Sequence, residues 1–517
     1  MMLLLRLLLE ESDKWTLFDV DISLDVVVVF ATLVGFALAW AIGANDVANT
    51  FGTSVGAKVL TVRQAVVIAA IFEFLGAFLM GSQVATTIQS IIDPLDYEDN
   101  PEQLAVGLTA AMIGAWSLVT VATWFSLPVS ATHAVIGAVM GFAIVAQGID
   151  GVIWEEVGRI AFSWVASPVL SGLLALVMYL LVRTLVLRSS NSFYRGLAFM
   201  PLCYFFTLTI NVFLVIFKAS GGGLIDFSSL ETWALVLIAL GSGFVAGLLS
   251  LASLPWVKRK AEERSALKLE QQALNGPEPE GGEEEDVACV PVSVPSPAPY
   301  HSSEAEEDGF SKALYDEEEE ERQEAKEESE EKVIDLRENV EKFEPKTEEL
   351  FSSLQVLTAC FGSFAHGAND VANAIGPYAM IVSVNQTGVV TADAAIQWWI
   401  LAGGGLGIVI GLATWGYKVM MTIGENLAKV TPSRGFNIEL ASAITVVTGS
   451  KLGLPLSTTH CKVGAVVGVG LADGKNAVNW KLVLTVFGGW VITLPIAGAV
   501  AGVFYLAMWY LVDYTIT

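Results

Sequence analysis

The chain has 517 residues, of which 54% are hydrophobic and only 16% are charged. This composition excludes a single small soluble domain and is typical of a protein with many membrane-spanning segments. The formal net charge is −26, but residues 257–350 hold 30 of the 54 acidic and 12 of the 28 basic residues, so this stretch contributes −18 and the rest −8. Because neither part has a basic patch that would neutralise a nucleic-acid backbone, we expect no nucleic-acid partner.

The hydropathy pattern predicts an all-α polytopic membrane protein with about 12 transmembrane segments. Ten apolar stretches are long enough to cross a membrane, and two shorter ones, rich in Gly and Ala, follow Pro-containing polar breaks and are predicted to be half-helices or arms of helical hairpins. In chain order the long stretches are 24–44, 65–92, 105–125, 159–187, 197–217, 231–256, 351–375, 397–417, 437–453 and 482–512, and the short ones are 134–148 and 463–472.

The distribution of Lys and Arg orients these segments. If the N-terminus lies outside, ten basic residues fall on inner connections and six on outer ones, in agreement with the excess of positive charge on cytoplasmic loops. Residues 1–23 are then extracellular, and 257–350 form an acidic, largely disordered cytoplasmic loop. This loop separates a first membrane repeat (24–190), followed by additional scaffold helices (191–256), from a second membrane repeat (351–517).

One heptapeptide occurs twice in the chain. Gly43-Ala44-Asn45-Asp46-Val47-Ala48-Asn49 recurs without change at residues 367–373. On a helix, Asn45, Asp46 and Asn49 share one face, and so do Asn369, Asp370 and Asn373. An ionisable residue within an apolar run indicates a functional site, and carboxylate and amide oxygens are ligands that a hard cation such as sodium prefers.

The predicted orientation places the first heptapeptide at the inner end of its helix and the second at the outer end. The two membrane repeats therefore have inverted topology, which is the architecture of many secondary transporters with broken helices at the binding site.

A second motif is also duplicated. Leu127-Pro-Val-Ser-Ala-Thr-His133 corresponds to Leu454-Pro-Leu-Ser-Thr-Thr-His460, at nearly the same offset as the heptapeptides. Proline followed by Ser and Thr predicts a helix start, and the free N–H groups of a helix N-terminus within the membrane bind anions. Ser130, Thr132, Ser457, Thr458 and Thr459 are therefore candidate ligands of a tetrahedral oxyanion, whereas His133 and His460 are interpreted as packing or capping residues.

Only one basic residue, Lys462, is close to these motifs in the sequence, so co-bound cations at Asp46 and Asp370 are expected to supply the positive charge. A carboxylate in the site accepts a hydrogen bond from a protonated oxyanion. Phosphate keeps a proton near neutral pH and sulfate does not, so the site favours phosphate.

The two pairs of motifs resemble those of the inorganic phosphate transporter (PiT) family, which includes the eukaryotic sodium-dependent phosphate transporters. The resemblance covers about residues 26–190 and 350–512. It implies cation-coupled phosphate uptake without a cofactor, sodium as the co-transported ion, and a homodimer in the lipid bilayer.

By resemblance, phosphate-binding residues are Asp46, Ser130, Thr132, Asp370, Ser457, Thr458 and Thr459. The sodium-binding residues are Asn45, Asp46, Asn49, Glu73, Asn369, Asp370, Asn373 and Glu439, where Glu73 and Glu439 resemble family glutamates that are needed for transport. Ala131 and Thr458 differ at the central position of the second motif, so the two half-sites are not identical.

We therefore expect a secondary active transporter, most simply in the plasma membrane, that imports inorganic phosphate with sodium by alternating access. Coupling to protons, or transport of a related oxyanion such as sulfate, are the alternatives. An intramembrane aspartyl protease is disfavoured because each Asp is flanked by Asn residues, which suit a cation better than a shared proton. A passive channel would not move phosphate against its gradient. No catalytic constellation is visible, so no enzyme is expected.

Overall fold

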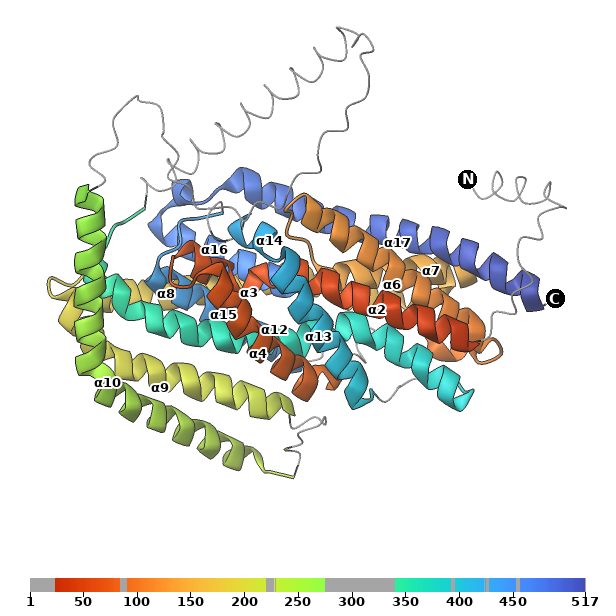
Figure 1. The fold of residues 1–517 in the computed structure, drawn as a ribbon, viewed down its shortest axis with the longest axis horizontal. Coiled ribbons are helices and arrows are strands. Elements are labelled where there is room, and N and C mark those ends of the chain that lie inside the picture. Colours follow the sequence, from red (N-terminus) through yellow and green to blue (C-terminus); the bar gives the residue numbers. More distant parts are fainter. Residues whose placement is uncertain are drawn as a thin grey trace, which may run out of the picture.

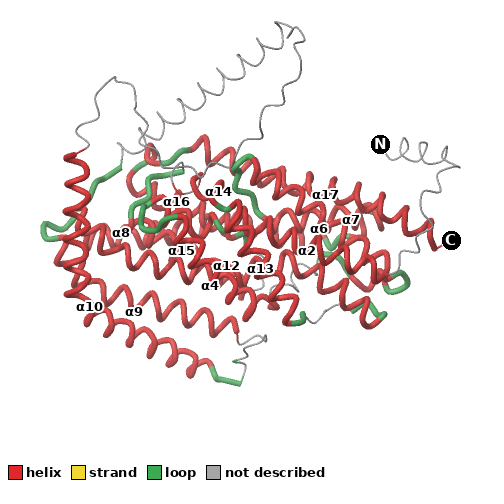
Figure 2. The backbone as a smooth tube through the Cα atoms, in the orientation of Figure 1, coloured by secondary structure: helices red, strands yellow, loops and turns green. Residues whose placement is uncertain are grey.

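A computed structural model of the chain describes residues 24–83, 91–219, 227, 229–274, 340–391, 396–422, 424, 427–451 and 456–516. Within these ranges the protein is helical, apart from an isolated β-bridge between Ala428 and Val478 (Figure 2). The expected all-α fold is thus confirmed for the described part of the chain.

The described helices form an elongated molecule, in which helices from the beginning and the end of the chain lie at the same end and α10 lies at the other (Figure 1). The α-helices are α2 (Leu24–Asp46), α3 (Ala48–Gly56), α4 (Val62–Met80), α6 (Pro101–Trp124), α7 (Ala131–Gln147), α8 (Trp154–Val182), α9 (Ser192–Ala219), α10 (Thr232–Leu274), α12 (Pro345–Thr387), α13 (Trp398–Trp415), α14 (Tyr417–Met421), α15 (Pro432–Lys451), α16 (Thr458–Asp473) and α17 (Trp480–Ile516). Short helical turns are η1 (Gly81–Gln83), η2 (Pro94–Tyr97), η3 (Ile149–Gly151), η4 (Arg183–Leu187) and η6 (Lys475–Ala477).

Within the described residues, each of the twelve predicted apolar segments coincides with a helix, and residues 84–90 of the second segment lie outside the described part of the chain. Among the described residues, eight helical stretches are long and apolar enough to cross a membrane. The other four helices are α7, α12, α15 and α16, which are either short or carry the polar residues singled out above. The segment 1–23 and most of the acidic loop lie outside the described residues. Helices enter that loop from both sides, because α10 continues to Leu274 and α12 begins at Pro345.

Helices of the first half of the chain pack on helices of the second half. Helix α4 of the first half packs on α12 of the second, and α13 of the second packs on α2 of the first. In the same way α7 packs on α17, and α16 packs on α8 (Figure 1). The two halves therefore share an extensive interface, in addition to the packing of helices within each half.

Repeated glycines allow this packing between the halves. A Cβ at Gly137 on α7 would overlap the backbone of Leu494, and a Cβ at Gly464 on α16 would overlap the backbone of Pro168. Both glycines are needed because they let the short helices approach the long ones at backbone contact, as small residues do between membrane helices. Helices α9 and α10 pack on each other beside these pairs.

Candidate functional site

The N-termini of α7 and α16 meet inside the molecule. Ser130 is the N-cap of α7 and accepts a hydrogen bond from the His133 backbone N–H at 3.3 Å, and Ser457 caps α16 in the same way through His460 at 3.4 Å. The rings of His133 and His460 lie 4.5 Å apart between their centroids. The predicted helix starts are thus confirmed, and their positive ends point at one buried region.

The two histidines pack against tryptophans, as the sequence suggested. The His133 ring centroid lies 4.1 Å from that of Trp164 on α8, and the His460 ring centroid lies 3.6 Å from that of Trp490 on α17. Each histidine lies in the first turn of a short helix and contacts the long helix that follows it in the same half.

Both heptapeptide aspartates face the region where the short helices begin. Asp46 and Asp370 are 2% and 1% exposed, and together with His366 they form a cluster whose ligand atoms all lie within 4.8 Å of one another. Two carboxylates at this separation in a dry interior repel each other unless cations or protons compensate their charge. The cluster is therefore a site that attracts positive charge.

His366 supplies part of this compensation and was not identified from the sequence. Its Nδ1 atom lies 2.9 Å from Glu73 Oε2, and its Nε2 atom lies 2.8 Å from Asp370 Oδ2. A neutral imidazole carries one N–H and can donate to only one of the two carboxylates. The Glu73–His366–Asp370 arrangement therefore holds a second proton, either on the histidine, which is then ionised, or on one of the carboxylates. A signal was available, because His366 directly precedes the second heptapeptide where the first has Ile42.

Hydroxyl and amide groups from both halves converge on the aspartates. Thr458 donates to Asp370 at 2.8 Å, and Asn369 donates to the other oxygen of the same carboxylate at 2.8 Å. The Thr459 hydroxyl lies 3.5 Å from Asp46 and 3.2 Å from the carbonyl oxygen of Val129.

One more hydrogen bond joins the two halves at this site. Asn373 of the second heptapeptide donates to the hydroxyl of Thr132 on α7 at 3.2 Å. Residues of both duplicated motifs and of both halves are therefore in one place.

Asn45 differs from the other predicted ligands. Its side-chain amide donates to Thr123 at 2.9 Å and to the carbonyl of Leu127 at 3.0 Å, and its oxygen accepts from the Val129 N–H at 3.1 Å. These contacts hold the turn before α7, so Asn45 is a positioning residue in this structure. The side chain of Asn49 lies outside the described residues.

Glu439 on α15 is the centre of a second polar cluster. One of its oxygens accepts from Thr53 and Ser54 on α3, both at 2.7 Å, and from Gln355 at 3.3 Å. The other accepts from Thr358 on α12 at 2.6 Å. Glu439 is 2% exposed, and these donors compensate the burial of its charge.

A cavity of about 30 Å³ connects the two clusters. Its lining includes Glu439 and Lys462, His366 and Thr458, and Thr50 of α3. Lys462, the one basic residue close to the motifs in the sequence, is 4% exposed and lines this cavity, so it adds a basic side chain to the site. The cavity has room for about two water-sized particles.

The site therefore combines two kinds of recognition. Two helix N-termini with hydroxyl groups suit an oxyanion, and carboxylates with nearby hydroxyl and amide oxygens suit a hard monovalent cation. Such a pairing of opposite charges lets each ligand reduce the desolvation free energy of the other.

Comparison with known proteins gives a consistent result. The sequence pattern of the phosphate transporter family matches residues 42–501. The chain is 32% identical to sodium-dependent phosphate transporter 1-A of Xenopus laevis over 87% of this chain and 91% of that protein, and 32% identical to sodium-dependent phosphate transporter 2 of Bos taurus over 87% and 92%.

A solved structure described as the sodium-dependent phosphate transporter superposes with a TM-score of 0.72, at 32% identity, over 94% of this chain and 99% of that one. The resemblance noted in the sequence is thus confirmed, and the expectation of a transporter rather than an enzyme agrees with it. The chain belongs to the phosphate transporter family.

Proposed function

We propose that the protein imports inorganic phosphate together with sodium by alternating access. The observation that carries this proposal is the convergence of the α7 and α16 N-termini on the buried carboxylates Asp46 and Asp370. The names of the relatives support sodium as the coupling ion. Phosphate occupies the hydroxyl-lined end of the site, and sodium lies beside the carboxylates.

Backbone chemistry adds to the cation site. Pro377 lies within α12 and has no N–H to donate to the carbonyl of Asn373, four residues earlier. In the first copy, the helix is interrupted at Val47 between α2 and α3. Both heptapeptides thus lie where the regular ladder of backbone bonds is incomplete, which is where transporters bind cations.

The size of the cavity supports alternating access. Room for about two water-sized particles is too little for phosphate, which has five heavy atoms, so phosphate would need the surrounding helices to move apart before it could bind there. The packing of helices from one half on helices of the other is the arrangement expected of two inverted repeats with twelve crossings, and rocking of one half against the other would open the cavity to each side in turn.

The membrane arrangement is part of the same proposal. We assign the repeats to residues 24–190 and 351–517, the extra helices to 191–256 and the N-terminus to the outside. A plasma-membrane location and a homodimer complete the proposal, both taken from the sequence-based expectations above.

Proton coupling is a second candidate because of His366. The chain from Glu73 through His366 to Asp370 is built as a proton path would be, with contacts of 2.9 and 2.8 Å. In this case protons on the carboxylates replace sodium.

The test is uptake of labelled phosphate into proteoliposomes of the purified chain. An inward sodium gradient at equal pH on both sides is expected to drive phosphate above its external concentration. Accumulation with an inward proton gradient alone would assign proton coupling instead. Absence of accumulation under both gradients, with folded protein, would contradict the proposal.

A further inference from the structure

Helix α10 changes from apolar to basic residues after Trp256. Up to Trp256 it is apolar and exposes large side chains, with Leu249 66% and Leu251 52% exposed. The sequence then continues with Lys258, Arg259 and Lys260. Pro255 lies at the change, and α10 turns sharply in Figure 1 and then runs across the direction of α9. The change marks the boundary between hydrocarbon and water, where Trp is enriched and basic residues follow on the cytoplasmic side.

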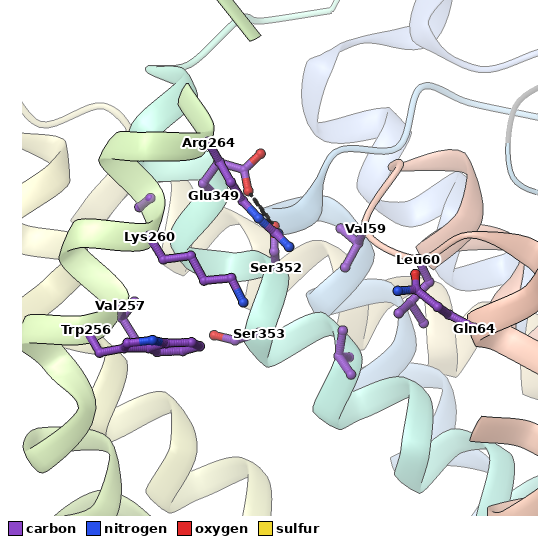
Figure 3. Close-up of a pocket in the computed structure, with 12 residues that line it drawn as sticks. Val59, Leu60, Gln64, Trp256, Val257, Lys260, Arg264, Glu349, Ser352 and Ser353 are labelled. Carbon is purple, nitrogen blue, oxygen red and sulfur yellow. Dashed lines mark hydrogen bonds and ion pairs between the residues drawn. The ribbon is translucent and has the colours of Figure 1, made fainter. Parts of the chain in front are cut away.

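A pocket of about 310 Å³ lies at this boundary. It is enclosed by the arm of α10 after Pro255, the first turns of α12 and the turn between α3 and α4 (Figure 3). Its polar groups are the side chains of Lys260 and Arg264 on α10, Glu349, Ser352 and Ser353 on α12, and Gln64 on α4. The pocket is far larger than the cavity at the transport site.

The basic side chains in this pocket are only partly neutralised. Arg264 lies 3.6 Å from Glu349 and is 47% exposed in its side chain. The Lys260 ammonium lies 4.5 Å from the centroid of the Trp256 ring and reaches toward Ser353 (Figure 3). Within the described part of the chain, Lys260 makes no ion pair with a carboxylate. The Ser352 and Ser353 hydroxyls already donate to Glu349 and to the Leu350 carbonyl, at 3.3 and 3.4 Å. The pocket therefore offers one positive charge that no carboxylate compensates and the side-chain amide of Gln64.

This chemistry fits the phosphate ester of an anionic headgroup. A free phosphate ion would gain nothing from the apolar walls formed by Val59, Leu60 and Trp256, whereas a lipid would place its glycerol region against them. Its acyl chains would then lie along the exposed apolar face of α10 before Pro255. Anionic lipids are enriched in the cytoplasmic leaflet, where basic residues attract them.

We propose that this pocket binds the headgroup of an acidic phospholipid from the cytoplasmic leaflet. The lipid would tie α10 to α12 and to the α3–α4 turn. Ser352 is one turn before Gln355, which donates to Glu439, so the lipid site adjoins the elements that hold this glutamate. The proposal does not depend on which ion drives transport.

The test measures binding of a short-chain fluorescent phosphatidylinositol phosphate to the purified full-length protein in neutral detergent, by fluorescence anisotropy. Lys260→Gln and Arg264→Gln are each expected to weaken binding about fivefold, and together about thirtyfold. Ser353→Phe fills the pocket without changing charge and is also expected to weaken binding. Thermal unfolding shows whether each variant is folded.

Arg259→Gln is the matched control. It removes the same charge from the same helix, but Arg259 does not line the pocket and pairs with Glu263 at 3.3 Å. It is expected to change the affinity less than twofold. Equal losses in Arg259→Gln and Lys260→Gln would overturn the proposal, because they would indicate attraction to basic charge in general.

The source of the headgroup is tested by competition. Glycerophosphoinositol phosphate, which is the same headgroup without acyl chains, is expected to compete far more weakly than the lipid. Competition at the same concentration would overturn the lipid assignment in favour of a soluble phosphate ester. Unchanged binding in all three pocket variants would overturn the site itself.

Discussion

The two heptapeptides have the same seven residues but different surroundings. Around Asp46 the helix is interrupted at Val47, and the carboxylate accepts from the backbone N–H of Ala131 at the start of α7 and, at 3.5 Å, from the Thr459 hydroxyl. Around Asp370 the helix is continuous, and His366, Thr458 and Asn369 contact the carboxylate at 2.8 Å. Three side chains therefore hold the second carboxylate and His366 contacts it directly, whereas the first is held by the backbone at the start of α7 and by one long side-chain contact.

The difference between the surroundings of the two aspartates arises from residues outside the repeated heptapeptide. Position 42 is Ile and position 366 is His, and Thr53 in the first copy corresponds to Pro377 in the second. A duplicated motif thus builds two similar backbones, while single residues beside it decide the charge of each half-site. We infer that the Asp46 side accommodates the exchangeable cation and that the Asp370 side orients it.

Replacing His366 by Ile, the residue at the equivalent position of the first copy, tests this difference most severely. It leaves Glu73 and Asp370 buried without their shared partner, which destabilises a protein by about 3–5 kcal/mol. Phosphate uptake per molecule of protein is expected to fall at least about a hundredfold. Ile42→Leu is the control in the other copy and should transport normally. Wild-type uptake by His366→Ile would contradict the role of the histidine.

Substitutions of the two aspartates are expected to differ in their effect on stability but not in their effect on transport. Asp370→Asn removes the charge that His366 and Thr458 contact, and we expect it to lower the free energy of unfolding by about 2–3 kcal/mol. Asp46→Asn should change stability by less, about 1 kcal/mol, because the amide oxygen of Asn can still accept from the Ala131 N–H and the Thr459 hydroxyl.

Both variants are expected to lose sodium-driven uptake. Thermal unfolding of the two purified proteins, compared with their uptake rates, measures the separation. Equal destabilisation by the two substitutions would show that the half-sites do not differ as proposed.

Glu439 extends the comparison, since the equivalent position of the first half is occupied by Met112. Glu439→Gln presents an NH₂ group to hydroxyls that donate to the carboxylate, and should destabilise the protein by about 2 kcal/mol and reduce uptake. Thr358→Val removes one donor only and is expected to reduce stability by about 1 kcal/mol. A larger effect of Thr358→Val than of Glu439→Gln, again in thermal unfolding, would exclude Glu439 as the centre of this cluster.

Substitutions of the two N-cap serines are expected to have the same effect in both copies of the second motif. Ser130→Ala and Ser457→Ala each remove an N-cap, with an expected loss of about 1 kcal/mol in the free energy of unfolding. If the hydroxyls also contact phosphate, KM for phosphate should rise about fivefold in both variants with kcat less affected. A loss of stability in one variant alone would mean that α7 and α16 are not equivalent.

Much of the fold was predictable because its signals are local. The lengths of the apolar stretches predicted the long helices, and the motifs with Pro followed by Ser and Thr predicted where α7 and α16 begin. The duplication also predicted that Asp46 and Asp370 would belong to one site. The extent of α10 was underestimated, because the apolar face of its charged arm consists of few residues, such as Val257 and Ala261, and hydropathy does not detect so short a face.

The polar partners were harder to predict because they depend on packing between distant segments. Thr53 and Glu439 are 386 residues apart, and no pattern in either segment indicates their contact. The structural role of Asn45 depends on where the Leu127 carbonyl lies, which is set by the turn before α7. His366 was visible in the sequence but lay one position outside the repeated motif.

The measurement that tests the central proposal most directly is the binding linkage between the two ions. Labelled phosphate binding to the purified protein is measured over a range of sodium concentrations, and labelled sodium binding over a range of phosphate concentrations, at constant pH. If both ions occupy one site, each raises the affinity for the other by the same factor. Phosphate affinity that does not change with sodium would contradict the account.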